Sequence, residues 1–193
     1  MLRPSAQTEV ELMPSMEWRR SGSQFIDRPL TTSGRRYLVG DLRQRTAALT
    51  MRGSYAFTST LTLQLYAQPF VSKGRYARVG EVTQPMASSP AARVAFFDPA
   101  AVTTSADGAS VTYPTSGGAV TIDNPDFSFA QLNANTVLRW EYRPGSTLYA
   151  VWNQGRTQDG YDGAVSVESG ARTLGRAPAT NVFLVKWSHY LGR

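Results

Sequence analysis

Apolar and polar side chains alternate along several long stretches of this chain. The stretch LRWEYRPGSTLYAVW, residues 138–152, contains two such runs joined by an Arg-Pro-Gly-Ser turn. In the first run one face carries Leu138, Trp140 and Tyr142, and the opposite face carries Arg139, Glu141 and Arg143. The same period of two recurs over residues 8–20, 45–57, 60–70 and 181–193. Such alternation predicts β-strands whose two faces meet different surroundings, and it predicts no helix.

The connections between these strands are alternately short and long. Residues 58–60 (TST) and the Pro-Gly-Ser turn at 144–146 allow only tight reversals of the chain. The other connections are expected at about residues 21–34, 73–133 and 155–180, which are rich in Gly, Ser, Thr, Asp and Pro. In an up-and-down meander, this order places every tight turn at one end and every long loop at the other. Bacterial outer-membrane barrels are built in this way.

Several of the expected strands are long enough to cross a bilayer. A tilted strand needs about nine to eleven residues to do so, whereas strands in soluble proteins average about five or six. Residues 37–57 and 61–71 reach or exceed the longer figure. The sequence therefore predicts an all-β fold, an antiparallel up-and-down meander that forms part of a transmembrane β-barrel. About six long strands, with short periplasmic turns and long external loops, would occupy residues 1–193 as one segment.

This interpretation assigns one face of the strands to lipid and the other to a polar interior. The aromatic residues expected to face lipid or form interfacial girdles are Trp18, Tyr55, Phe57, Trp140, Trp152 and Trp187. The charged residues expected to face the interior, where they would pair with neighbours, are Arg52, Arg139, Glu141 and Arg143. Tyr66 and Phe70 also lie on the polar face, where they would plug the interior or stack on sugar rings. A soluble sandwich with the same aromatic residues in its core is the alternative, because alternation alone does not distinguish the two.

The composition narrows the class of protein. Only 18% of the 193 residues are charged, against roughly 25% in an average soluble domain. There is no cysteine, which excludes disulfides and cysteine-ligated metals, and no stretch is apolar enough for a membrane-spanning helix. The net charge is +6, but the arginines are scattered singly along the expected strands, so nucleic acid is not an expected partner.

Few residues offer reactive chemistry. His189 is the only histidine, which removes any multi-histidine metal site, and a structural or interfacial role is expected for it. Asp123 and Asp126 (DNPD) and Asp159 and Asp162 (DGYD) are candidate loop contacts for a cation or a ligand. Capping of turns explains the first pair, and the second lacks the remaining ligands of an EF-hand. The sequence therefore predicts no catalytic residue, no metal centre and no cofactor.

Three stretches resemble a known bacterial family. Residues 63–82 (LQLYAQPFVSKGRYARVGEV), 124–156 and 181–192 (NVFLVKWSHYLG) match it in order and spacing. They are similar to the C-terminal β-barrel part of the domain-of-unknown-function family 5916, in which a module similar to family 9 carbohydrate-binding modules precedes an outer-membrane barrel. The resemblance implies that this chain corresponds to the last part of such a protein. Outer-membrane barrels usually end on an aromatic residue, whereas this chain ends Tyr190-Leu191-Gly192-Arg193, which puts recognition by the insertion machinery in doubt.

The resemblance implies a non-catalytic barrel segment of a surface binding or transport protein in the bacterial outer membrane. The implied partners are outer-membrane lipid, lipopolysaccharide, the barrel-insertion machinery and a carbohydrate ligand. Residues 1–12 contain no charged leader followed by an apolar stretch, and single-chain barrels start at eight strands, so we expect an export signal and further strands upstream. Two alternatives are a soluble β-sandwich or lipocalin-like ligand-binding domain, and a membrane-associated hydrolase whose catalytic part lies outside this chain.

Overall fold

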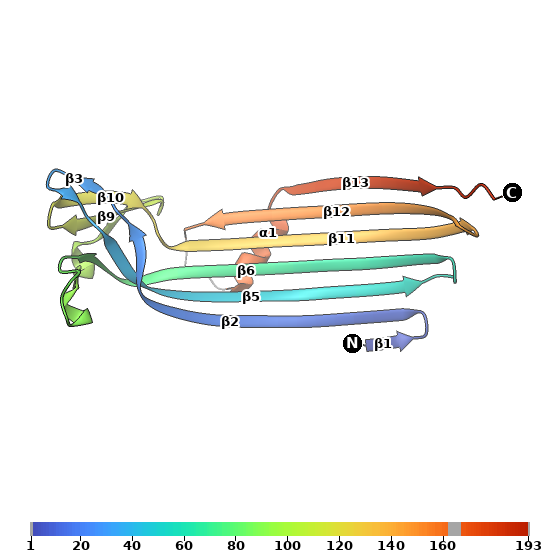
Figure 1. Cartoon of the computed structure of the whole chain (residues 1–193), viewed down its shortest axis with the longest axis horizontal. Helices are drawn as coiled ribbons and strands as arrows, with labels where there is room; N and C mark the ends of the chain where they lie inside the picture. Colours follow the sequence, from blue (N-terminus) through green and yellow to red (C-terminus); the bar gives the residue numbers. More distant parts are fainter. Residues whose placement is uncertain (1, 162–166, 193) are drawn as a thin grey trace.

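The computed structural model describes residues 2–161 and 167–192. Within these residues the main sheet is built from six long strands: β2 (Thr8–Asp27), β5 (Leu38–Ala56), β6 (Leu61–Val82), β11 (Phe127–Arg143), β12 (Ser146–Gly160) and β13 (Ala179–Ser188). β1 (Leu2–Ser5) extends the sheet beside β2, and β7 (Val94–Phe96) pairs with the end of β6. The order β1-β2-β5-β6-β11-β12-β13 follows the chain (Figure 1), so the predicted all-β, antiparallel meander is confirmed. No helix in the described part of the chain is long and apolar enough to cross a membrane.

The tight turns lie at one end of the sheet and the long connections at the other (Figure 1). We call these the tight-turn end and the long-connection end. Residues 6–7 join β1 to β2, residues 57–60 join β5 to β6, and residues 144–145 join β11 to β12. Gly145 has a φ of 74°, which a Pro-Gly turn requires at its second position and which glycine adopts without strain.

The strands extend further toward the long-connection end than the sequence indicated. The connections cover residues 28–37, 83–126 and 161–178, instead of about 21–34, 73–133 and 155–180. The clearest case is β6, whose last part, residues 72–82, still pairs with β5 and then with β7. Polar and charged residues lie on both faces of this part, so the period of two that identifies a strand disappears although the backbone pairing continues.

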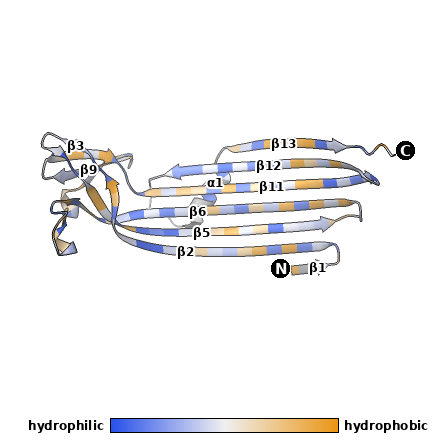
Figure 2. Ribbon diagram, viewed as in Figure 1, coloured by the Kyte–Doolittle hydropathy of each residue, from blue (hydrophilic) through white to orange (hydrophobic). Residues whose placement is uncertain are grey.

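The long connections fold into a small cap with its own hydrophobic core. The cap contains β3 (Leu30–Thr31), β4 (Gly34–Arg35), β8 (Thr103–Thr104), β9 (Ser110–Thr115), β10 (Gly118–Asp123) and two short 3-10 helices (Pro90–Ala92 and Pro99–Ala101). Its buried core consists of Leu38, Val111, Tyr113, Val120 and Ile122. Hydrophobic residues accordingly reappear at this end of the ribbon in Figure 2. The long sheet is thus followed at one end by a compact unit with its own core.

A buried carboxylate anchors the cap to the sheet. Glu81, near the end of β6, is only 3% exposed. Its side chain accepts hydrogen bonds from the backbone N–H and the hydroxyl of Ser116, at 2.7 and 2.8 Å, and lies 3.5 Å from the guanidinium of Arg36. Because Ser116 lies in the turn between β9 and β10, this one side chain holds the hairpin against β6. The buried charge is tolerated because it is both paired and hydrogen-bonded.

The sequence-based prediction that the chain contains no helix is wrong. α1 (Val167–Arg176) packs on one face of the sheet and lies behind it in Figure 1. Its sequence, VESGARTLGR, contains two glycines, each of which disfavours a helix by about 1 kcal/mol relative to alanine. Tertiary burial compensates for this: Leu174 is 3% exposed and packs with Val71 and Ala130 of the sheet. Arg156 also donates hydrogen bonds to two carbonyl groups at the end of the helix, at 2.6 and 3.1 Å.

The described residues form an open sheet, not a closed barrel. β1 pairs only with β2, and β13 pairs only with β12, so the sheet has an edge at each side. Every residue of β13 is exposed. An edge strand presents unpaired N–H and C=O groups that can template pairing with another strand.

Replacing Glu81 with alanine is expected to release the β9–β10 hairpin while leaving the long sheet intact. Removing one partner of a buried, paired charge costs about 3 kcal/mol or more. Hydrogen exchange at the amides of residues 110–123 should therefore become at least about 100-fold faster, while exchange in β11 stays unchanged. The control is Glu17→Ala, which removes an exposed carboxylate from β2. Equal exchange in the two variants would show that Glu81 does not anchor the cap.

The isolated chain is expected to oligomerise or aggregate because each edge leaves a row of backbone groups unpaired. In lipid each such group costs several kcal/mol. Size-exclusion chromatography with light scattering, on chain refolded with and without detergent, measures the outcome. A monodisperse monomer in plain buffer would contradict this expectation.

Candidate functional site

The strand register gives the sheet one apolar face and one polar face. On β6 the apolar face carries Leu61, Leu63, Leu65, Ala67, Pro69 and Val71, and the polar face carries Thr62, Gln64, Tyr66, Gln68, Phe70 and Ser72. Directly opposite residues on neighbouring strands share a face, so Leu63 lies beside Leu138 on the apolar face. The alternation is visible along the long strands in Figure 2. Trp140 falls on the apolar face and Arg139 on the polar face, as the period of two predicts.

The apolar face has little cover. All four tryptophans lie on it and remain exposed: Trp18 by 64%, Trp140 by 46%, Trp152 by 39% and Trp187 by 67%. The helix α1 covers only a patch of this face, around Val71 and Ala130. Contiguous exposed apolar surfaces larger than a few hundred Å² mark sites of contact with a protein, a ligand or a membrane. The apolar face therefore needs a partner.

An aromatic cluster lies at the tight-turn end. The indole N–H of Trp187 donates to the hydroxyl of Tyr142 at 2.7 Å, and that hydroxyl lies 2.9 Å from Nδ1 of His189. The His189 ring stacks on Tyr142 and on Trp187, with centroids 6.2 and 5.8 Å apart. Tyr55 and Phe57 form an edge-to-face pair with centroids 4.7 Å apart. Rings with an apolar body and a polar tip are typical of interfacial girdles.

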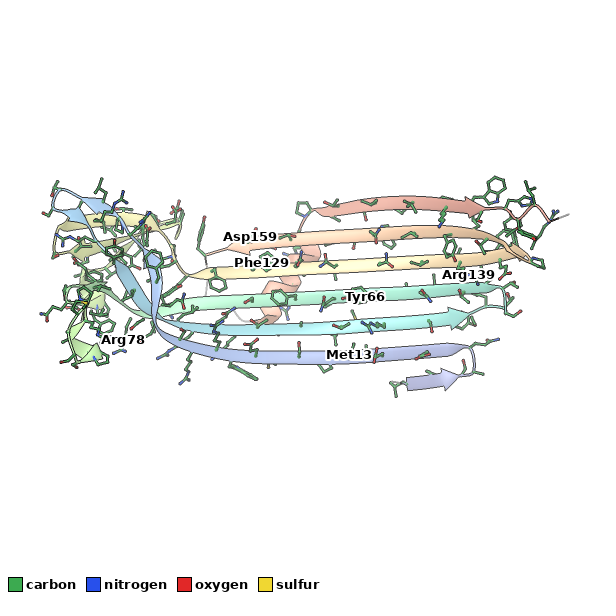
Figure 3. The ribbon with its side chains drawn as sticks, viewed as in Figure 1. Met13, Tyr66, Arg78, Phe129, Arg139 and Asp159 are labelled. Atoms are coloured by element: carbon green, nitrogen blue, oxygen red, sulfur yellow. The ribbon has the colours of Figure 1, made fainter. Side chains whose placement is uncertain are left out.

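Several charged residues of the polar face are paired. Arg139 and Glu141 form an ion pair of 3.0 Å along β11, and Arg52 of β5 lies 3.6 Å from Glu11 of β2. The expected pairing across strands therefore occurs for Arg52. Arg139 pairs with Glu141 of its own strand and also hydrogen-bonds to Tyr149, directly opposite on β12. Arg143 makes no ion pair with this group within the described residues; it is the exposed last residue of β11, next to the Pro-Gly turn. Figure 3 shows Tyr66 and Arg139 on the neighbouring strands β6 and β11.

An open groove of about 440 Å³ lies beside Arg52 and Tyr66. Its lining includes Glu9, Glu11, Arg52, Tyr66 and Asn135. The guanidinium of Arg52 lies over the Tyr66 ring, 6.0 Å from its centroid, and the Tyr66 hydroxyl donates to the amide oxygen of Gln68 at 3.0 Å. Phe70, farther along β6, makes an edge-to-face contact with Phe129, with centroids 6.0 Å apart. The polar face thus offers an aromatic ring beside carboxylate, guanidinium and amide groups.

The three loop aspartates that the structure describes do not come together as a metal site. Asp126 accepts a hydrogen bond from the backbone N–H of Tyr76 at 2.7 Å, and its own N–H donates to Asn124, which is the turn capping expected from the sequence. Asp123 is the last residue of β10, and Asp159 lies near the end of β12. The fourth aspartate, at position 162, lies outside the described residues. Among the described residues, no three His, Cys, Asp or Glu side chains could hold a metal ion together.

A pocket between β6 and the cap was missed by sequence reasoning. Its volume is about 410 Å³, and its lining includes Arg75, Tyr76, Arg78, Phe96, Phe97, Tyr113 and Asp126. The guanidinium of Arg78 lies 4.5 Å from the centroid of the Phe96 ring and 2.6 Å from a carboxylate oxygen of Asp41. These residues come from separate segments, so no local pattern could have indicated the pocket.

No protein-family model, curated protein or solved structure matches this chain. The function is therefore inferred from the geometry of the molecule. Its main features are the uncovered apolar face, the polar face with its groove, and the cap at the long-connection end.

The pocket gives the cap a measurable response to alkaline pH. Burial raises the pKa of Tyr113 to about 12, and the nearby Asp126 carboxylate adds to this effect. Because the unfolded chain loses this proton near its ordinary pKa of about 10, the folded cap should lose stability as the pH rises from about 10 to about 12. Burial also raises the pKa of Tyr76 in the same pocket, so ultraviolet titration should show more than one late-titrating tyrosine. The tyrosine that titrates near pH 12 should disappear in Tyr113→Phe and persist in the control Tyr161→Phe. Loss of the late titration in both variants, or in neither, would contradict the assignment.

Proposed function

We propose that this chain forms part of a bacterial outer-membrane β-barrel, with its apolar face toward lipid and its polar face toward the interior. The observation that carries the proposal is the height of the apolar band. On β6 the band extends over residues 61–71, and the ten steps between these residues span about 33 Å along the strand. At a strand tilt of about 40°, this corresponds to about 25 Å across the membrane, which is the height of the apolar band in outer-membrane barrels.

The limits of the band shift from strand to strand, which supports a tilted arrangement. On β2 the band begins at Val10, which the register places level with Leu65 of β6. On β6 itself the band begins two rows earlier, at Leu61. At the other limit, the apolar run on the apolar face of β2 ends before Arg20. On β12 the corresponding run ends before Gln154, which lies four rows nearer the tight-turn end. A band must cross tilted strands diagonally in order to stay level with the membrane.

The polar face supports a role in binding or transport. The groove beside Arg52 and Tyr66 combines an aromatic ring with hydrogen-bonding side chains, a combination suited to a sugar ring. Together with the resemblance to family 5916, this makes carbohydrate the proposed ligand class, with lipopolysaccharide and the barrel-insertion machinery as further partners. The proposed role is non-catalytic, and any hydrolytic activity would belong to a part of the protein outside this chain. The open edges of the sheet would be paired by further strands.

The second candidate function is that of a soluble β-sandwich or lipocalin-like ligand-binding domain. It is favoured by α1, which packs Leu174 onto the apolar face as a core helix would. The helix has ten residues and is about 15 Å long. It leaves Trp140 and Trp187 exposed at the tight-turn end. A soluble fold would need a second layer of structure over this area. We therefore prefer the membrane proposal to the soluble alternative.

Quenching by brominated lipids tests the proposal. The protein is refolded with vesicles whose acyl chains carry bromine either near their middle or near the headgroup. In single-tryptophan variants, Trp152, near the middle of the band, should be quenched more strongly by the deep bromine. Trp18, one row beyond the last apolar row of β6, should be quenched more strongly by the shallow bromine.

The matched control is Tyr149→Trp in a chain whose native tryptophans are replaced by phenylalanine. Tyr149 lies on the polar face of β12, so its replacement should not be quenched by either lipid. Quenching of Trp152 at neither depth, in a protein that folds in plain buffer, would reject the membrane proposal in favour of the soluble alternative. Equal quenching of residues 149 and 152 would reject the assignment of the faces.

A further inference from the structure

We infer that a basic row at the long-connection limit of the apolar band binds the phosphate groups of anionic membrane lipids. The basic row consists of Arg20 of β2, Arg43 of β5 and Arg75 of β6, which lie directly opposite one another. The inference rests on the proposed function, because only a membrane would bring lipid to this face. It adds to that proposal a ligand class, anionic lipid, and a position for its phosphate group at the edge of the apolar band.

The basic row is unfavourable without an anion. Neighbouring strands lie about 4.8 Å apart, and like charges directly opposite one another destabilise a sheet. Arg75 lies 3.9 Å from Asp126, which is a long ion pair. Within the described part of the chain, Arg20 and Arg43 make no ion pair and are exposed. Phosphates lying between neighbouring guanidinium groups would remove the repulsion.

The adjacent row also carries charged residues, of which Arg45 is exposed and Lys73 is buried. Arg45 lies directly opposite Trp18 on one side and Lys73 on the other, one row nearer the tight-turn end than the basic row. On β6 the last apolar residue, Val71, comes directly before this adjacent row on the same face. Charged side chains therefore begin where the hydrocarbon layer would end, and an interfacial tryptophan marks the same level.

The position of the row, next to the apolar band, fits a lipid phosphate better than a carboxylate-bearing protein. A guanidinium binds phosphate oxygens through parallel N–H···O hydrogen bonds, and several arginines in a line present many such donors. The apolar band directly below would hold the acyl chains of the same lipid. A lipid would thus contact the basic row with its phosphate and the apolar band with its acyl chains, whereas a free phosphate would contact the basic row alone.

The test compares two double variants with the same change in charge. Arg20→Gln with Arg43→Gln neutralises two members of the basic row. The matched control, Arg19→Gln with Arg143→Gln, neutralises two exposed arginines, one on the polar face and one at the tight-turn end. Native mass spectrometry of the refolded protein in a neutral detergent measures binding of phosphatidylglycerol and of phosphatidylcholine.

We expect the basic-row variant to bind phosphatidylglycerol roughly 30-fold more weakly, because each basic residue near an anionic surface contributes about fivefold in affinity. The control variant should bind it as the unchanged protein does, and phosphatidylcholine should bind weakly to all three. Equal binding of phosphatidylglycerol by the two double variants would overturn the inference. Displacement of the lipid by an equal concentration of inorganic phosphate would also overturn it, since the site would then take free anions.

Quenching of Trp152 by brominated lipid, measured on the same three proteins, separates this inference from the proposed function. If Trp152 is quenched normally but the basic-row variant still binds phosphatidylglycerol as the unchanged protein does, the lipid site is overturned and the membrane proposal stands. Absence of quenching in the unchanged protein overturns the membrane proposal, and the lipid site with it. Quenching in all three proteins also shows that the double variants have folded.

Discussion

The continuous hydrogen-bond ladder of the long strands is the interaction on which the rest of the structure depends. β5 and β6 stay paired, with one register shift, from the Ala56–Thr62 pair at the tight-turn end to the Leu38–Glu81 pair beside the cap. Because directly opposite residues share a face, the ladder collects single residues of different strands into rows. It unites the tryptophans on one face and brings the three arginines of the basic row together. Changing the register by one residue would exchange the two faces.

A single strand meets two environments along its length. On β6 the first eleven residues alternate between apolar and polar, whereas the residues from 72 onward have mixed character and end in the anchor of the cap. On the proposed function, the first part crosses the membrane and the second part stands in water. There the strand is stabilised by paired neighbours and by the core around Leu38 and Tyr113. On this proposal, the long connections supply the hydrophobic burial that lipid would supply to the rest of the sheet.

The helix α1, which partly covers the apolar face, is compatible with both candidate functions. α1 protects the patch around Val71 with Leu174, and Arg156 of β12 binds the end of the helix. On the proposed function, the helix would lie at the membrane surface, over the last apolar residue of β6, Val71. In a soluble fold it would be the beginning of a second layer. The two candidate functions place the same exposed tryptophans in different surroundings: lipid in the first and a protein core in the second.

Much of the fold could be predicted from the sequence because strand pairing leaves a local signal. The period of two identified the strands where their faces differ, and the Pro-Gly turn before Ser146 identified a tight reversal. That signal also placed Trp140 and Arg139 on opposite faces before any contact was known. It failed beyond residue 72 of β6, where both faces carry charged residues, and at α1, whose glycines weaken the local preference for a helix.

By itself, the amino-acid sequence determined the all-β class, the meander and the division of residues between two faces, because these depend on neighbours along the chain. Only the tertiary structure decided which residues of separate strands share a row. It also decided that the loops form a cap, that Glu81 anchors it, and that a helix with weak local preference packs on the apolar face. These features depend on register and burial between segments far apart in the chain, and a local pattern does not encode them.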